Sequence, residues 1–296
     1  MVKMKTDLEL FIEEETLKQR STGVPVRASL PERLVVRRCD PKRLHPNPED
    51  EFCFPDIGPN MGIVSSYVSE FVDHMKRGLP VMEEPLYIQK IRPSGYMILN
   101  GHHRWAAALR LSLKSVPVRV VNGVYEGDIK KILEVSTHEK RATIDLDEVV
   151  FASSQEETAE KRRGIPFYGL QKKRLRLGIP ALFQNLRLKG YDIWVYSSNF
   201  YSVDDIGRFF KHYGVSVDGI ITGLKKKSGS PSKEKKKTDE LIANKYRMTL
   251  HIDRDILVAT YGRSGDFREA AIKADSPGTW SAAVIDALEG IEKNEK

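Results

Sequence analysis

The stretch that decides the fold reads TIDLDEVVF (residues 143–151). Its β-branched and aliphatic residues predict a buried strand. Three later stretches have the same character, and helical patterns separate them. These are DIWVYSS (192–198), GIIT (219–222) and TLHID (249–253). Strands that alternate with helices predict an α/β domain with a doubly wound, mostly parallel sheet and helices on both faces.

Polar side chains stand at the carboxyl ends of these strands, where open parallel sheets form their active sites. Asp145 and Asp147 end the first strand, Ser197 ends the second, and Asp253 follows the last. Two carboxylates two residues apart point the same way along a pleat. The crowded negative charge is costly unless a hard dication offsets it, so the pattern predicts a Mg²⁺ site.

A second α/β unit precedes this domain, and its strands and helices alternate over about 90 residues. Its expected strands are LVVRR (34–38), PLYIQKI (85–91), YMIL (96–99) and VPVRVV (116–121), with helices over 65–78 and 104–111. We expect four segments in all. They are an N-terminal helical extension (1–30), a first domain (31–128), a linker (129–141) and a second domain (142–296).

Composition excludes several classes of protein. The 296 residues carry 48 Lys and Arg against 41 Asp and Glu, a formal net charge of +7 that suits an anionic partner. The two cysteines, Cys39 and Cys53, have no CxxC neighbour, which argues against a zinc finger or a disulfide framework. No apolar run approaches a membrane span of about 20 residues. We expect a soluble, cytoplasmic protein with no membrane partner.

The first unit contains a glycine turn between a strand and a helix, ILNGHHRW (98–105). Gly101 lets the backbone approach a ligand closely. The helix that starts near His102 directs N–H groups and a positive dipole end toward that ligand, and Arg104 adds a cation. His102 and His103 are adjacent and face different directions, so they form a poor metal pair. The turn therefore predicts a phosphate site.

This turn, with PLYIQKI before it, resembles the ParB/sulfiredoxin superfamily over about residues 34–123. Members carry G-x-x-R at the nucleotide phosphates, which implies that ATP, ADP or CTP contacts Gly101, His102, His103 and Arg104. The superfamily includes partition proteins that bind and hydrolyse CTP, sulfiredoxins and kinases of free serine. The helical DNA-binding domain of partition proteins is absent after the turn, and His102 replaces the sulfiredoxin cysteine.

The kinase members of that superfamily have a D-G-H-H-R-like turn and an upstream catalytic Glu. In this sequence Asn100 occupies the Asp position. Glu49 and Glu51, just after LHPNP (44–48), are the candidates for the Glu. The resemblance thus implies nucleotide binding, and kinase activity is an alternative.

Residues 140–285 resemble the haloacid dehalogenase-like (HAD) phosphohydrolase superfamily in four ordered motifs. Asp145 and Asp147 match its Asp-x-Asp, Ser197 matches its second strand end, and Asp253 and Asp255 match its last acidic strand end. The resemblance implies that Asp145 is the nucleophile and Asp147 the general acid and base. It also implies that Ser197 binds the phosphoryl group and that Mg²⁺ lies among Asp145, Asp147 and Asp253.

The remaining HAD motif is a lysine before a helix, and LKKKSGSPSKEKKKTDEL (224–241) offers seven lysines up to Thr238. Thr238 is a good N-cap, so Lys236 or Lys237 fits best. The alternative for most of these lysines is a solvated surface loop. About 50 residues separate Asp147 from Ser197, which leaves little or no room for a cap domain. Relatives without large caps have open sites and often act on bulky substrates.

The segment 161–176 is basic and could steer an anionic substrate or nucleic acid. Phe167 and Tyr168 in it could stack a base. An amphipathic surface helix with its aromatic rings in the core is the alternative. The basic residues are Lys161, Arg162, Arg163, Lys172, Lys173, Arg174 and Arg176.

The sequence thus favours a Mg²⁺-dependent phosphohydrolase joined to a nucleotide-binding module, acting on a nucleotide, a nucleic acid or another phosphorylated substrate. One rival is an ATP- or ADP-dependent kinase of a small hydroxyl compound, with its chemistry at the Gly101 turn. The other rival is a regulatory protein that binds nucleotide without catalysis.

Overall fold

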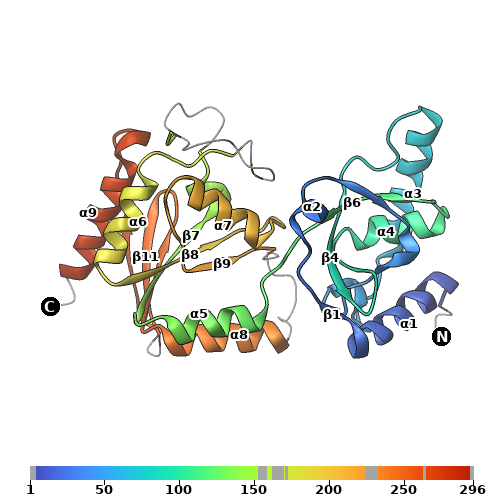
Figure 1. The fold of residues 1–296 in the computed structure, drawn as a ribbon, viewed down its shortest axis with the longest axis horizontal. Helices are drawn as coiled ribbons and strands as arrows, with labels where there is room; N and C mark the ends of the chain where they lie inside the picture. Colours follow the sequence, from blue (N-terminus) through green and yellow to red (C-terminus); the bar gives the residue numbers. More distant parts are fainter. Residues whose placement is uncertain are drawn as a thin grey trace. The chain divides into compact units, whose positions relative to one another are not determined.

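The structure is a computed structural model, and it describes residues 5–152, 159–161, 170, 173–223, 233–262 and 265–293. The chain divides into two units, Met1–Asn122 and Gly123–Lys296 (Figure 1). The domain boundaries expected from the sequence stay predictions. Over the described ranges, no helix has both the length and the apolar character needed to cross a membrane.

The first unit contains a six-stranded mixed sheet in the order β2-β6-β4-β5-β3, with β1 paired to β4. Neighbours β4 and β5 are antiparallel, whereas β4 and β6 are parallel. The strands are β1 (Val24–Pro25), β2 (Arg37–Cys39), β3 (Leu44–His45), β4 (Leu86–Arg92), β5 (Tyr96–Asn100) and β6 (Val116–Val120). The helices are α1 (Asp7–Thr22), α2 (Leu30–Arg33), α3 (Met61–Lys76) and α4 (His102–Arg110), and two short 3₁₀ turns are η1 (Pro41–Arg43) and η2 (Glu51–Cys53).

Helix α4 forms the centre of the first core. Trp105 is fully buried, and its indole Nε1–H donates to the Pro41 backbone oxygen at 2.8 Å. Three consecutive buried alanines (106–108) follow it, and their small side chains let the helix pack closely on its neighbours. Phe71 of α3 and Ile12 of α1 belong to the same cluster. The N-terminal helix is therefore part of the first core.

The second unit contains a six-stranded sheet in the order β12-β11-β10-β7-β8-β9. Strands β10, β7, β8 and β9 are parallel, as the sequence predicts. The strands are β7 (Lys140–Asp145), β8 (Tyr191–Tyr196), β9 (Gly219–Ile221), β10 (Met248–Ile252), β11 (Ile256–Tyr261) and β12 (Phe267–Ala271). The helices are α5 (Glu126–Val135), α6 (Ile179–Leu188), α7 (Val203–His212), α8 (Lys233–Lys245) and α9 (Trp280–Lys293), and the 3₁₀ turn η4 (Pro277–Thr279) precedes α9.

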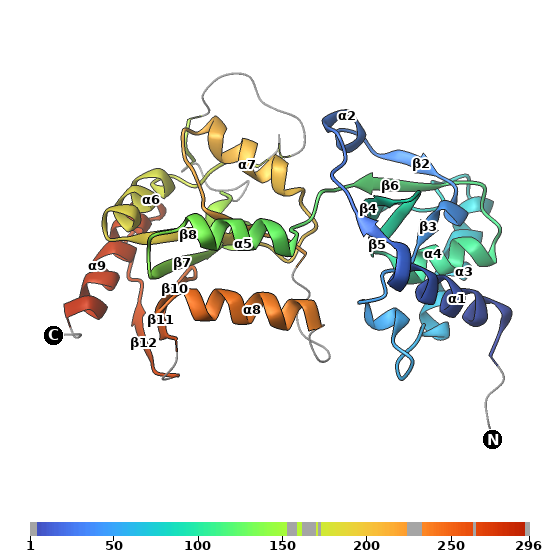
Figure 2. The same cartoon turned by 60° about the horizontal axis from the view of Figure 1, so that its bottom comes forward.

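Helices cover both faces of this sheet, as expected from the alternating pattern. On one face α6, α7 and α9 pack over a large core around β7 and β8. On the other face α5 and α8 lie side by side in both views, and Ile129, Trp194 and Tyr246 join them to the sheet (Figures 1 and 2). Burial on both faces explains why these strands read as continuous apolar runs.

The first predicted strand is shorter than the sequence suggested. β7 ends at Asp145, and the chain then forms one helical turn, η3 (Leu146–Val150). Asp145 Oδ1 accepts the backbone N–H groups of Asp147 at 2.7 Å and Glu148 at 2.8 Å, so this carboxylate caps the turn. The prediction of a strand as far as residue 151 was therefore wrong. The aliphatic residues of the turn are buried, so the turn has the same apolar composition as a buried strand.

Candidate functional site

Three parallel strand ends of the second unit carry the predicted site residues. Strand β7 lies between β8 and β10, which places the ends that bear Asp145, Ser197 and Asp253 side by side. Burial raises the pKa of Asp145, and the nearby charges of Asp147 and Glu148 add to this rise. The two backbone N–H groups on Asp145 Oδ1 act in the opposite direction.

Asp147 is anchored by side chains from outside its own turn. The Ser197 hydroxyl, which is fully buried, donates to Asp147 Oδ2. The Tyr201 hydroxyl donates to Asp147 Oδ1 at 2.7 Å, and Lys173 Nζ lies 3.8 Å from the same oxygen. The Asn199 backbone N–H donates to Ser197 Oγ at 2.9 Å, which fixes the hydroxyl. This carboxylate is therefore held in one orientation between β7 and the segment after β8.

Asp253 lies at the turn between β10 and β11 and is exposed. Its own Oδ1 accepts the Arg254 backbone N–H at 2.7 Å. Tyr196, at the end of β8, is affected by the charges of both Asp253 and Asp145. Burial and then the charges of Asp145, Asp253 and Glu148 raise the pKa of Tyr196 to about 12. Asp145 and Asp253 thus act electrostatically on the same phenol.

Asp145, Asp147 and Asp253 carry carboxylate oxygens, which are the ligands that Mg²⁺ prefers. Both oxygens of Asp147 already accept hydrogen bonds from Ser197 and Tyr201. Among the described residues, no three His, Cys, Asp or Glu side chains are grouped closely enough to hold a metal ion. Two carboxylates, from Asp145 and Asp253, remain as the candidate ligands. Mg²⁺ commonly binds one or two protein carboxylates and keeps several waters.

Lys236 and Lys237 are in helix α8, and their side chains are outside the described part of the chain. Most of the basic segment 161–176 is outside it as well, including Arg162, Arg163, Phe167, Tyr168 and Lys172. Arg176 differs from the sequence expectation, because it is 3% exposed and its Nε donates to the Val149 backbone oxygen at 2.7 Å. Its guanidinium also stacks over Trp280 at 5.4 Å from the ring centroid. Arg176 therefore supports the core and does not contribute to a surface patch.

In the first unit, Gly101 caps helix α4 with a φ of 100°. A Cβ at this position would lie 2.5 Å from Leu86 Cδ2 and 3.1 Å from Arg104 Nη2. Both the left-handed backbone and the close approach require glycine. The strand β5 therefore leads directly to the helix N-terminus, as the sequence predicts.

The two histidines of the turn hold a long loop. The imidazole of His102 is buried, and its Nε2 accepts the Asn47 backbone N–H at 3.1 Å. Its other nitrogen, Nδ1, lies 3.5 Å from Asp50 Oδ2. His103 Nε2 accepts the Asn60 backbone N–H at 3.2 Å. The histidine side chains therefore fix the loop 47–60 against the turn.

Arg104 is also held in place. Its Nη1 donates to the Glu84 backbone oxygen at 2.7 Å and lies 3.6 Å from the Glu84 carboxylate. Its side chain is 11% exposed, and Nη2 points toward Gly101. A cation is thus fixed beside the N-terminus of α4, an arrangement that can bind an anion.

Three contacts of these sites escaped the sequence analysis. Asp50 reaches His102, although its neighbours Glu49 and Glu51 were the candidates named for this turn. Tyr201 and Lys173 reach Asp147 from segments that follow β8 and precede α6. Tyr201 is only four residues after the predicted site residue Ser197, so its position in the sequence could have identified it.

The comparisons with known proteins cover different parts of the chain. The sequence model of the ParB N-terminal domain family matches residues 59–135. No curated protein matches this chain.

Two solved proteins are similar to parts of the chain. One is a C-terminally truncated chromosome-partitioning protein ParB from Caulobacter crescentus complexed with CTP-γ-S. It shares 24% identity over 29% of this chain, with a TM-score of 0.22, and the chain spans 43% of that protein. The other is a free serine kinase, seen with ADP and with AMP, at 12% identity over 83% of this chain and 90% of that chain, with a TM-score of 0.24. The family match, which includes the Gly101 turn, identifies residues 59–135 as similar to the ParB N-terminal domain.

Proposed function

We propose that the second unit is a Mg²⁺-dependent phosphohydrolase with Asp145 as its nucleophile. The arrangement of Asp145 and Asp147 carries the proposal. One oxygen of Asp145 is occupied by two backbone N–H groups, which leaves the other for attack. Asp147 lies two residues away and is oriented by Ser197. The order β10-β7-β8-β9 of the parallel strands supports the HAD-like reading.

In this reaction the free oxygen of Asp145 attacks phosphorus and the ester P–O bond breaks. Asp147 gives a proton to the leaving oxygen. Asp147 then takes a proton from a water molecule, which attacks the aspartyl-phosphate and releases inorganic phosphate. Asp145 returns to its starting form. The hydrogen bonds from Ser197 and Tyr201 keep Asp147 in position through both steps.

Asp145 and Asp253 would hold the Mg²⁺, which would neutralise the phosphoryl oxygens. Asp147 completes the metal set predicted from the sequence, but both of its carboxylate oxygens accept hydrogen bonds, so we propose it as the acid and base and not as a ligand. Lys236 or Lys237 stays the proposed lysine of the site. These assignments rest on the sequence motifs and on the neighbouring strand ends that carry Asp145 and Asp253.

The test is hydrolysis of an aryl phosphate with Mg²⁺ by the full-length protein and by Asp145→Asn. We expect the variant to lose activity by at least about 1,000-fold, because the nucleophile is absent. EDTA should abolish the activity, and added Mg²⁺ should restore it. Asp286→Asn is the matched control, since Asp286 is exposed on α9 and the chemical change is the same. Equal hydrolysis by wild type and Asp145→Asn would contradict the proposal.

We propose that the first unit binds a nucleotide, ATP, ADP or CTP, at the Gly101 turn. The fixed guanidinium of Arg104 beside the N-terminus of α4 supports this proposal, and so does the family match over this segment. The nucleotide phosphates would contact the backbone of residues 101–104. Arg104→Ala should weaken nucleotide binding by at least about 10-fold in calorimetry. Arg110→Ala, on the same helix, is the control.

A kinase of a small hydroxyl compound is the second candidate for the first unit. The acidic turn 49–51 lies beside His102, and this observation favours it. Transfer from ATP or ADP to serine, followed by mass spectrometry, tests it. The kinase predicts transfer that Arg104→Ala abolishes and Asp145→Asn preserves. Nucleotide binding without transfer or hydrolysis in the wild type would favour the regulatory role.

A further inference from the structure

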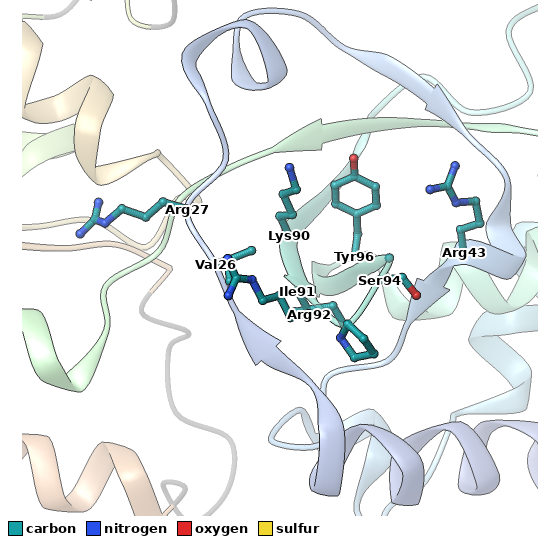
Figure 3. Close-up of a pocket in the computed structure, with 10 residues that line it drawn as sticks. Val26, Arg27, Arg43, Lys90, Ile91, Arg92, Ser94 and Tyr96 are labelled. Atoms are coloured by element: carbon teal, nitrogen blue, oxygen red, sulfur yellow. The ribbon is translucent and has the colours of Figure 1, made fainter.

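The first unit has a pocket of about 480 Å³ at the turn between β4 and β5 (Figure 3). Arg43 and Arg92 contribute to its lining. Their guanidinium groups lie on opposite sides of the turn and point away from one another, so they are not arranged to bind one anion together. In the second unit, the hydroxyl of Tyr196 is better placed to contact a phosphoryl group.

Tyr196 lies beside the proposed nucleophile. Strands β7 and β8 are parallel neighbours, and Asp145 is paired with Tyr196. Paired residues of neighbouring strands point to the same face of a sheet, and the strands lie about 4.8 Å apart. Earlier on these two strands, the Arg141 guanidinium lies over the Trp194 ring at 5.7 Å from its centroid. By the alternation of side chains along a strand, Arg141 shares a face with Asp145, and Trp194 shares a face with Tyr196.

The proposed nucleophile has a different group on each side. The strand order β10-β7-β8 places Asp253 on one side of Asp145 and Tyr196 on the other. The proposed Mg²⁺ would lie on the Asp253 side. A phosphoryl group at Asp145 would therefore meet the cation on the β10 side and the phenol on the β8 side. The charges of Asp145, Asp253 and Glu148 all act on Tyr196, which agrees with this position.

The Tyr196 hydroxyl can donate to a ligand. The residue is half-buried, so part of it is open to solvent. Within the part of the chain that the structure describes, its hydroxyl forms no hydrogen bond. A phenol keeps its proton at neutral pH. Its O–H is therefore available to an oxygen atom of a substrate.

A second donor is needed at this site because Ser197 has one proton. The sequence motif assigns Ser197 to the phosphoryl group, and its hydroxyl donates to Asp147 in the structure. A hydroxyl carries a single O–H, so it cannot donate to Asp147 and to a phosphoryl oxygen at the same time. The Tyr201 hydroxyl also donates to Asp147. Of these three hydroxyls, the one on Tyr196 is not used by Asp147.

We propose that Tyr196 is a further catalytic residue, whose hydroxyl donates to an oxygen of the transferring phosphoryl group. This inference rests on the proposed phosphohydrolase function of the second unit. A fixed donor beside the reacting group accelerates the reaction when its hydrogen bond is stronger in the transition state than in the bound substrate.

Hydrolysis of an aryl phosphate with Mg²⁺ by the full-length protein is the first test. Tyr196→Phe removes the hydroxyl and keeps the ring. We expect kcat to fall about 10- to 100-fold, the loss of one hydrogen bond to a charged group, and KM to change by less than about 3-fold. The urea midpoint should not move, since this hydroxyl has no partner among the described residues. Tyr261→Phe is the control, because Tyr261 pairs with Met248, the first residue of β10, at the opposite edge of the sheet.

Binding of orthovanadate in the presence of Mg²⁺ is the second test, and it does not depend on turnover. Vanadate adopts the five-coordinate geometry of a phosphoryl group in transfer, and such analogues bind more tightly than substrates. Calorimetric titration of the full-length protein measures its affinity. We expect Tyr196→Phe to weaken vanadate binding by at least about 10-fold and Tyr261→Phe to leave it unchanged.

The outcomes separate this inference from the proposed function. Hydrolysis that is lost in Asp145→Asn and undiminished in Tyr196→Phe would overturn the role of Tyr196 and keep the phosphohydrolase. Hydrolysis that Ser198→Ala reduces and Tyr196→Phe does not would assign the donor to Ser198, the exposed residue after Ser197. If the wild type hydrolyses nothing, the proposed function fails, and the vanadate titration decides the inference. Binding that is weaker in Tyr196→Phe supports the contact, whereas equal or absent binding overturns it.

Discussion

The hydroxyl of Ser197 donates a hydrogen bond to Asp147, across the boundary between two neighbouring strand ends. Ser197 is fully buried, so this bond is shielded from water. The bond couples the orientation of Asp147 to the segment after β8. In the proposed reaction Ser197 therefore has two roles, because it would bind the phosphoryl group and it orients Asp147, the acid and base.

Ser197→Ala should reduce aryl phosphate hydrolysis about 10- to 100-fold. The loss corresponds to one hydrogen bond to a charged group, about 1.5–3 kcal/mol. Tyr201→Phe removes the other hydroxyl on Asp147 and should reduce hydrolysis by a similar factor. Steady-state kinetics with Mg²⁺ measure both. Tyr67→Phe, in the first unit, is the control, and unchanged rates in both site variants would contradict the positioning role.

The acid limb of the pH–activity profile should report Asp145, whose pKa is raised by burial and by neighbouring charges. The nucleophile must be ionised, so activity should fall as the pH drops through its pKa, which bound Mg²⁺ would lower from the raised value of the metal-free protein. Glu148→Gln removes one of the neighbouring charges and keeps the backbone N–H bond to Asp145. The acid limb should therefore move to lower pH. Glu134→Gln, on α5, should leave it unmoved, and a shift to higher pH for Glu148→Gln would refute the assignment.

Stability at low pH should depend on Glu32. Hydrogen bonds from Lys90 and Ser29 lower its pKa from 4.5 to about 2. A depressed folded-state pKa adds stability above the ordinary value, and this stability is lost as the pH falls from about 4.5 to about 2. Urea denaturation of the first unit measures this effect. The free energy of unfolding of Glu32→Gln should depend less on pH over this window than that of wild type. The control is Glu70→Gln, on the exposed side of α3, and identical pH dependence of Glu32→Gln and wild type would count against the pair.

A buried aspartate should stabilise the second unit. Asp192, at the start of β8, accepts hydrogen bonds from Tyr246 at 2.6 Å, from His138 at 2.8 Å and from Ser136. Tyr246 directly follows α8, and Ser136 and His138 lie in the segment between α5 and β7. Asp192→Asn should lower the free energy of unfolding by about 2–3 kcal/mol, because an amide cannot accept all these donors. Urea denaturation measures the change, and exposed Asp73→Asn should change it by less than about 1 kcal/mol.

Gly101→Ala should destabilise the first unit by at least about 1 kcal/mol. The left-handed backbone and the 2.5 Å approach to Leu86 both oppose a side chain. The variant should also weaken nucleotide binding at the turn. Gly127→Ala is the matched control, because nothing lies within 4 Å of a Cβ there and its backbone is helical. A Gly101→Ala protein with unaltered stability would contradict this account of the turn.

Local patterns in the sequence were enough to predict the four parallel strands of the second sheet. Each strand is a short apolar run between helical segments. A strand buried on both faces has apolar residues at successive positions, so the run is easy to recognise. The antiparallel pair β11 and β12 was not predicted, although ILVATY (256–261) is rich in β-branched residues. The acidic residues before β11 were assigned to a functional site, and no strand was predicted after Asp255.

The contacts of the site residues were harder to predict than the strands. His102 holds the backbone of Asn47, which is 55 residues earlier, and Ser197 holds Asp147, which is 50 residues earlier. Periodicity reports which face of an element is buried and not which distant loop covers it. Arg176 shows the same limit, because its position in a basic run suggested a surface patch whereas its side chain is buried against Trp280.

Each sheet is built from one uninterrupted stretch of chain. Every strand of the first sheet lies between Val24 and Val120, and every strand of the second lies between Lys140 and Ala271. During synthesis on the ribosome, the first sheet therefore has all its strands before the second has any. Neither sheet needs to wait for a strand from the other, so folding can follow the direction of translation, and the exposure of unpaired strand edges is limited to one sheet at a time.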